Sequence, residues 1–259
     1  MSDVFNIKRF AGYYKYDFKN IVSRYGFSFM ILSCAGLFFY MFYILFHFLF
    51  SNYEWQAPSF NTRLLFFFAM SCAMAITFPA KSYGFLTNKK EGSEFTLIPV
   101  SVTEKFIAMM FNSLVVLPIL FVLIYFGCDG LICAMDPTAH SSLALNFNSF
   151  FRDSGNADFV NVSIVRAYFS LVNGIMVFLL GALIFKKRKI SGVILILMSI
   201  SVLVIILIAS YFNGTNGTDW NINFLHFAKT YNIIEIIWTW IVFFGISTAI
   251  FFRIKTIKH

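Results

Sequence analysis

Long uncharged stretches are the feature that most constrains the fold of this chain. Charged residues make up only 12% of the 259 residues, and they gather in short clusters between apolar runs. A helix needs roughly 20 mostly apolar residues to cross a hydrocarbon core about 30 Å thick. Six runs are long enough, and they cover about residues 26–50, 64–86, 106–127, 163–185, 190–212 and 233–252. We therefore expect an all-α integral membrane protein, with six transmembrane helices in a single domain at residues 26–252.

The placement of Lys and Arg predicts the orientation of these spans. If the N-terminus is inside, sixteen of the twenty basic residues fall on the inner side. The cytoplasmic side of membrane proteins is enriched in Lys and Arg. We therefore expect both ends in the cytoplasm, including a short tail at residues 253–259. The same bias accounts for the net charge of +8 without a nucleic-acid partner.

Residues 1–25 have a character of their own, too polar and basic for a signal peptide. Apolar residues recur there at spacings of four and three, which predicts one helix with an apolar stripe. The stripe comprises Ile7, Ala11, Tyr14, Phe18, Ile21 and Tyr25. Ser2 or Asp3 is the expected N-cap. We favour an amphipathic helix that lies in the inner headgroup layer. The alternative is a cytoplasmic helix packed on the bundle.

No catalytic or nucleotide-binding motif occurs in the sequence. It lacks a G-x-x-x-x-G-K-[ST] loop, an H-E-x-x-H pair and a G-x-S-x-G turn. We expect no enzymatic activity, no bound cofactor and no metal site in this chain. No acidic residue falls in the middle of a predicted span, which argues against a proton-coupled carrier.

Two pairs of residues lie towards the predicted outer side. Arg166 opens the fourth span and Glu235 opens the sixth, so they are candidates for an ion pair between helices. The alternative is that each side chain reaches the headgroups independently. Cys128 and Cys133 fall in one outer loop, where they are candidates for a disulfide if that compartment is oxidising.

Two local patterns concern the packing of the spans. Pro118 lacks a backbone N–H and is expected to kink the third span. Ser170 and Gly174, with Gly181 one heptad further on, give the fourth span a face of small residues. Such a face allows close approach of another helix, within the bundle or between subunits.

The inner loop between the second and third spans carries the most specific pattern. Asn88 with Glu91 fits the start of a short helix, and Pro99 ends it. Ser101 and Glu104 then form a capping box that opens the third span. The short helix would present Phe95, Leu97 and Ile98 to water or to a partner. The alternative is a connecting turn whose apolar residues lie on the membrane surface.

This loop resembles the inner loop of type-2 ABC exporter permeases. The similarity lies in Gly92, the run Leu97-Ile98-Pro99-Val100-Ser101, and Glu104-Lys105. The N-terminal helix, the six spans and the inner termini are similar to the layout of that family. The stretches Lys8-Arg9-Phe10 and Lys15-Tyr16-Asp17 resemble its bacterial members more weakly.

The resemblance implies a multi-pass permease of the cell (inner) membrane. It would pair with a second permease subunit, identical or related, and each would dock on a separate P-loop ATPase that binds ATP-Mg. The loop would be the coupling helix for that ATPase, formed by Glu91, Gly92, Glu94, Phe95, Leu97, Pro99, Ser101, Glu104 and Lys105. The alternatives are a carrier or channel that acts alone, and a membrane scaffold or assembly protein.

Overall fold

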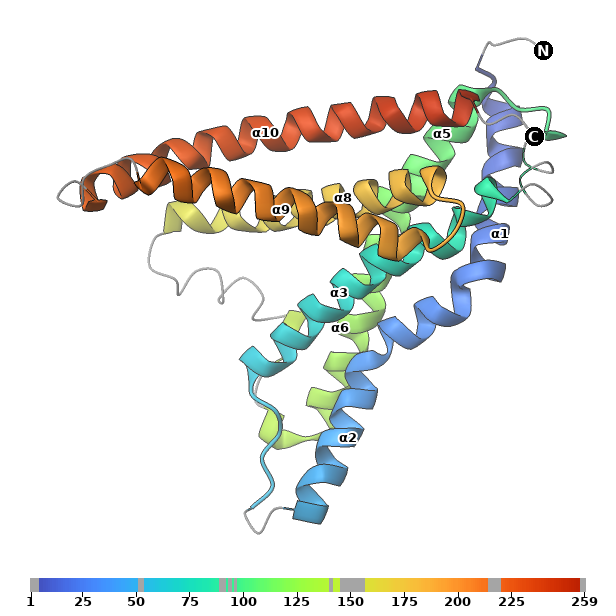
Figure 1. The fold of residues 1–259 in the computed structure, drawn as a ribbon. Helices are drawn as coiled ribbons and strands as arrows, with labels where there is room; N and C mark the ends of the chain where they lie inside the picture. Colours follow the sequence, from blue (N-terminus) through green and yellow to red (C-terminus); the bar gives the residue numbers. More distant parts are fainter. Residues whose placement is uncertain are drawn as a thin grey trace. The chain divides into compact units, whose positions relative to one another are not determined.

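The computed structural model describes residues 5–50, 54–88, 92, 95, 97–139, 142–144, 157–213 and 220–256, with side chains undescribed at 157–167, 207–213 and 220–236 (Figure 1). Within that part of the chain every regular element is helical, which confirms the expected all-α class. The elements are α1 (Ile7–Ser33), α2 (Ala35–Phe50), α3 (Phe60–Ser82), the 3-10 helix η1 (Gly84–Thr87), α5 (Val102–Phe111), the π turn η2 (Asn112–Val116), α6 (Leu117–Met135), the 3-10 helix η3 (Pro137–Ala139), α8 (Ala157–Ile184), α9 (Lys189–Asn213) and α10 (Trp220–Thr256).

Several of these helices are long and apolar enough to cross a membrane. Within the described residues, four runs qualify by length and composition: α3, the continuous α5–α6 run, α9 and α10. Helices α1 and α2 qualify together as one broken span, bent by 41°. The part of α8 whose side chains are described, Tyr168–Ile184, is a shorter apolar helix. The chain thus has the helices of a multi-pass membrane protein, while six crossings and their orientation stay predictions.

The exposed surface of α9 also fits a membrane. Leu195, Met198 and Ile205 are 69%, 65% and 63% exposed. A soluble protein does not leave a whole helix of large apolar side chains in water, because the hydrophobic effect favours their burial. Lipid is the environment in which such a surface is stable.

The described chain forms two compact units. The first unit comprises residues 1–82 and 99–175, and the second comprises residues 83–98 and 176–259. In the first unit α1 packs against α3, α5 and α6, and α2 packs against α3 and α6. The buried face of α1 repeats every four residues and consists of Tyr13, Asp17, Ile21, Tyr25, Phe29 and Ser33.

The structure corrects the expected N-terminal helix in three respects. The helix begins at the cap Asn6, whose side chain accepts hydrogen bonds from the backbone N–H groups of Lys8 and Arg9. It continues without a break past residue 25, and the break comes at Cys34 instead. Its buried face shares only Ile21 and Tyr25 with the predicted stripe, since α1 packs on neighbouring helices. The packing on neighbouring helices is thus present, while the position of this helix relative to the membrane stays a prediction.

Helices α1 and α2 run parallel to α5 and α6, with contacts at nearly the same sequence separation. Arg9 contacts Glu104, 95 residues further along the chain, and Asp17 contacts Asn112 with the same separation of 95. At the other end the hydroxyl of Tyr40 donates to Asp136, a separation of 96. The separation thus changes by only one residue across the break at Cys34 and the π turn η2. We call these two runs the parallel helix pair.

The distortion near Pro118 takes the form of the π turn η2, which ends at Val116, two residues before this proline. Proline has no N–H to donate, so the Leu114 carbonyl lacks its usual helical partner at Pro118. The Tyr168 hydroxyl of α8 donates to that carbonyl oxygen at 2.9 Å. A side chain from another helix thus replaces the missing backbone bond.

The second unit is held by close contacts at the ends of its helices. A Cβ added at Gly181 would overlap Val193 of α9, so α8 and α9 approach closely at this glycine. The Arg253 Nε of α10 donates to the Leu183 carbonyl in the last turn of α8, at 3.0 Å. The Lys189 ammonium at the start of α9 donates to the carbonyl of Gly84.

Candidate functional site

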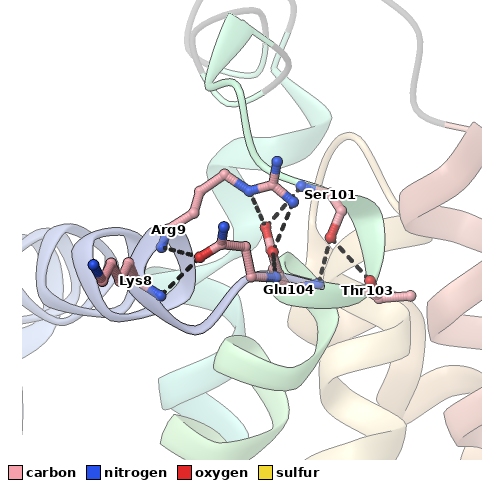
Figure 2. A network of polar contacts seen from close by, with 6 residues as sticks. Lys8, Arg9, Ser101, Thr103 and Glu104 are labelled. Carbon is pink, nitrogen blue, oxygen red and sulfur yellow. Dashed lines mark hydrogen bonds and ion pairs between the residues drawn. The ribbon is translucent and has the colours of Figure 1, made fainter. Parts of the chain in front are cut away.

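The predicted capping box at the start of α5 is present. The Ser101 Oγ accepts a hydrogen bond from the Glu104 backbone N–H at 3.3 Å, and Glu104 Oε2 accepts one from the Ser101 N–H at 3.0 Å (Figure 2). These two bonds satisfy N–H groups that a helix start leaves without partners. They fix the direction in which the chain enters α5.

Glu104 also binds the first turn of α1. Its Oε2 accepts from Arg9 Nε at 2.9 Å, and its Oε1 accepts from Arg9 Nη2 and from the Asn6 backbone N–H, both at 2.8 Å. Figure 2 shows the Arg9 guanidinium laid against both carboxylate oxygens of Glu104. We call Asn6, Arg9, Ser101 and Glu104 the N-terminal clamp.

The N-terminal clamp is centred on a buried carboxylate, which distinguishes it from a salt bridge between two exposed side chains. Glu104 is fully buried, and the Arg9 side chain is 29% exposed. A buried carboxylate is stable only where charge-assisted hydrogen bonds replace its water. Here Arg9, Asn6 and Ser101 supply donors to both oxygens, and the bidentate Arg9 contact also fixes their geometry. The start of α1 and the start of α5 are therefore joined at one point.

Sequence reasoning identified Glu104 and Ser101 but missed Arg9 and Asn6. The capping box is a local pattern, four residues long, whereas Arg9 lies 95 residues away from its partner. In the sequence, Arg9 is one of sixteen basic residues on the predicted inner side and part of the Lys8-Arg9-Phe10 stretch, and neither feature identifies its partner. The contact follows from the pairing of α1 with α5, which is visible only in the structure.

The structure describes part of the inner loop. Gly92, Phe95 and Leu97 have helical conformation, and the Gly92 N–H donates to the Asn88 carbonyl at 2.8 Å. Glu91 and Glu94 lie outside the described residues. The expected exposure of Phe95 is wrong, because its side chain is only 6% exposed.

The remaining loop residues differ in their exposure. Leu97 is 77% exposed, whereas Ile98 is half-buried. Pro99 is exposed where the chain leaves the loop, and Lys105 is buried within the first turn of α5. Of Phe95, Leu97 and Ile98, only Leu97 is therefore exposed and accessible to a partner.

A second polar cluster joins α3 to α6 near the ends that the charge pattern places outside. Arg63 Nη1 and Asp129 Oδ1 form an ion pair at 2.8 Å, with side chains only 6% and 5% exposed. Arg63 Nη2 donates to the Ala139 carbonyl at 3.1 Å, and the Leu143 N–H donates to Asp129 Oδ2 at 2.6 Å. We call Arg63 and Asp129 the outer ion pair. Sequence reasoning placed Asp129 in a loop, but α6 continues past it to Met135.

Asp136, the C-cap of α6, accepts hydrogen bonds from three residues. It accepts hydrogen bonds from the Tyr40 hydroxyl, from Trp55 Nε1 at 2.7 Å, and from the backbone N–H and hydroxyl of Thr138 at 2.8 and 2.7 Å. Burial, the largest single influence, raises the pKa of Asp136, but these hydrogen bonds together outweigh it and hold the pKa below its usual range. The carboxylate thus stays ionised and fastens α2 to the end of α6.

The structure places both candidate disulfide cysteines on α6 rather than in a loop. Positions five apart on a helix are rotated by about 140°, so their side chains leave different faces. Both thiols are free, and Cys133 Sγ instead accepts a contact from Arg63 Nη1 at 3.1 Å. The disulfide considered between Cys128 and Cys133 is therefore not present. The side chains of Arg166 and Glu235 lie outside the described residues, so their ion pair stays a prediction.

The polar groups described above fasten helices to one another. Among the residues that the structure describes, no three His, Cys, Asp or Glu side chains gather as a metal site would require. The N-terminal clamp at one end of the parallel helix pair and Asp136 at the other hold that pair together. Comparison with known proteins found no matching family model, no matching curated protein and no matching solved structure.

Proposed function

We propose that this chain is the permease subunit of an ABC exporter, driven by a separate P-loop ATPase. The observation that carries the proposal is the N-terminal clamp. It ties the end of the loop that resembles a coupling helix to the starts of α1 and α5 together. A loop that receives force from an ATPase has to be attached in this way for the helices to follow.

The parallel helix pair extends the attachment. The loop reaches α5 directly through the Ser101–Glu104 capping box, and it reaches α1 through Arg9. Asp17 and Asn112, both buried, join the two runs again at 2.9 Å. A displacement at the loop would therefore move both runs together. Alternating access requires helices that change position as units rather than bend independently.

Leu97 is the proposed contact with the ATPase. It is 77% exposed in a short helical segment that Pro99 terminates. An exposed Leu beside a capped helix start suits a shallow apolar groove on a partner. Phe95, which is buried, would instead support the packing of the loop.

The proposed assembly contains two permease subunits, identical or related, and ATP-Mg bound by the ATPase subunits. A carrier or channel acting alone is less well supported. The buried charges of the outer ion pair bind each other and neighbouring backbone groups, which is the pattern of a structural contact. The co-purification test described next distinguishes a permease from a scaffold without transport activity.

The test is to purify the full chain from its native membrane in a mild detergent and to identify co-purifying chains by mass spectrometry. We expect a chain with a P-loop and ATP hydrolysis in the purified complex. Leu97→Asp should reduce the recovery of this ATPase about tenfold or more. The matched control is Ile7→Asp, because Ile7 is 75% exposed and also lies on the predicted inner side.

Two outcomes would reject the proposal. One is that the wild-type chain brings down no P-loop ATPase under conditions in which the complex is chemically cross-linked before extraction. The other is that Leu97→Asp and Ile7→Asp retain the ATPase equally. The second outcome removes the coupling role of the loop even if an ATPase is present.

A further inference from the structure

Three consecutive basic residues form the turn between α8 and α9. Only residues 185–188 separate the last residue of α8, Ile184, from the first residue of α9, Lys189. Lys186, Lys187 and Arg188 are all exposed, and Arg188 has a positive φ of 49° that lets the chain reverse. We call these three residues the basic turn.

The length of the basic turn fixes its depth in a membrane. A four-residue connection that reverses direction reaches less than about 7 Å beyond the helix ends, since an extended residue spans about 3.5 Å. The exposed apolar side chains of α9 require hydrocarbon around it from its first turns onward, as at Ile194 and Leu195. The basic turn therefore lies at the level of the lipid headgroups and cannot project far into the solvent.

A second helix brings more positive charge to the same place. Arg253 donates through Nε to the Leu183 carbonyl at 3.0 Å, which holds the end of α10 against the end of α8. Arg253 thus lies close to the basic turn, although it comes from a distant part of the sequence.

The cations of this cluster have no acidic residue on the described parts of their own unit. Among the side chains described in residues 83–98 and 176–259, none is Asp or Glu. Four cations held close together at headgroup depth repel one another. A negative charge supplied from outside the chain would relieve that repulsion.

We propose that the basic turn, with Arg253, binds the headgroup of an anionic phospholipid. Clusters of four or more Lys and Arg directly beside a transmembrane helix are suited to this chemistry. The Arg guanidinium matches the phosphate geometry with two parallel hydrogen bonds, and Lys contributes point charge. A zwitterionic headgroup carries the same phosphate but no net charge, so the cluster discriminates between the two lipids.

The size of the effect follows from the number of cations. Each Lys or Arg near an anionic surface strengthens binding about fivefold. Removing the three charges of the basic turn should therefore weaken binding by up to about 100-fold. This inference is independent of the proposed transport function, because it concerns only the lipid around the chain.

The experiment uses the full chain in a neutral detergent, with bound lipid counted by native mass spectrometry. The probes are dioleoylphosphatidylglycerol, dioleoylphosphatidylcholine and inorganic phosphate. We expect the phosphatidylglycerol to bind at least tenfold more tightly than the phosphatidylcholine, and inorganic phosphate not to displace it at millimolar concentration. Lys186→Gln/Lys187→Gln/Arg188→Gln should lose that preference.

The matched control is Lys8→Gln/Lys15→Gln/Lys19→Gln, which removes three exposed charges from α1 and should change binding less than twofold. A charge-conserving variant, Lys186→Arg/Lys187→Arg/Arg188→Lys, should bind as the wild type does. Elution of the triple Gln variants as single species separates lost binding from misfolding. Equal losses in both triple Gln variants would overturn the proposal, since they would show attraction to total charge. Displacement by inorganic phosphate would overturn it in favour of a free-anion site. Unchanged lipid binding, with loss of a protein partner from the basic-turn variant, would overturn it in favour of a protein-docking surface.

Discussion

The outer ion pair allows a sharp test of the packing of α3 and α6. In Asp129→Asn the amide oxygen can still accept from the Leu143 N–H, but Arg63 loses its counter-charge in a buried site. Leaving one member of a buried ion pair costs about 3–5 kcal/mol. For a chain of this size, 1 kcal/mol corresponds to about 2–4 °C in Tm, so Asp129→Asn should lower Tm by about 6–20 °C.

Replacing both charges should be less harmful than replacing one. Exchange of a buried ion pair for apolar residues of similar volume often stabilises a protein by about 1–4 kcal/mol. In Arg63→Met/Asp129→Leu, however, the Ala139 carbonyl and the Leu143 N–H also lose partners, at about 1–3 kcal/mol each. The expected net loss is about 1–2 kcal/mol, so the double variant should be more stable than Asp129→Asn.

The assay is thermal unfolding of the detergent-purified chain, followed by tryptophan fluorescence. Glu54→Gln is the control, because it removes an exposed carboxylate from the same predicted side and should leave Tm within about 1 °C. The reasoning is refuted if Asp129→Asn melts like the wild type, or if the double variant is less stable than the single one. A wild-type Tm with abolished transport would show instead that Asp129 belongs to the translocation pathway.

Three further predictions concern other contacts. Gly181→Ala should lower Tm, because the added Cβ would overlap Val193 and overpacking costs about 1–3 kcal/mol. The control Gly174→Ala, with no atom near the added Cβ, should leave Tm unchanged. Equal Tm values for the two variants would contradict the close approach of α8 and α9. Because the folded-state pKa of Asp136 is lowered, its contribution to stability is present above the unfolded pKa and is lost as pH falls through the folded value. Melting between pH 5 and pH 2 should therefore show an acid-dependent loss, below the ordinary Asp pKa of about 3.9, that is smaller in Asp136→Asn, and identical profiles would argue against it. Ser101→Ala should cost about 1 kcal/mol and speed hydrogen exchange at the start of α5, while unchanged exchange there would mean that the capping box is dispensable.

The sequence predicted those features that depend on neighbouring residues. The Ser101–Glu104 capping box and the positions of the long helices follow from patterns a few residues to a few turns long. The partner of Glu104 could not be predicted in this way, since Arg9 lies 95 residues away and any of the inner basic residues would have served equally well. The helix of the predicted third span continues past residue 127 to Met135. Asp129 lies inside α6 since Arg63 neutralises it there. Phe95 was expected outside because its burial depends on tertiary packing that a short loop sequence does not encode.

The parallel helix pair has a consequence for how the chain is made. The ribosome adds about 5–20 residues per second, so α1 waits roughly 5–20 s for the residues of α5 that complete it. During this interval Arg9 and Asp17 lack Glu104 and Asn112, the partners that they have in the finished structure. A nascent helix with an apolar stripe and flanking lysines can remain at the membrane surface for that time. The N-terminal clamp can therefore close only after the residues of α5 have been made.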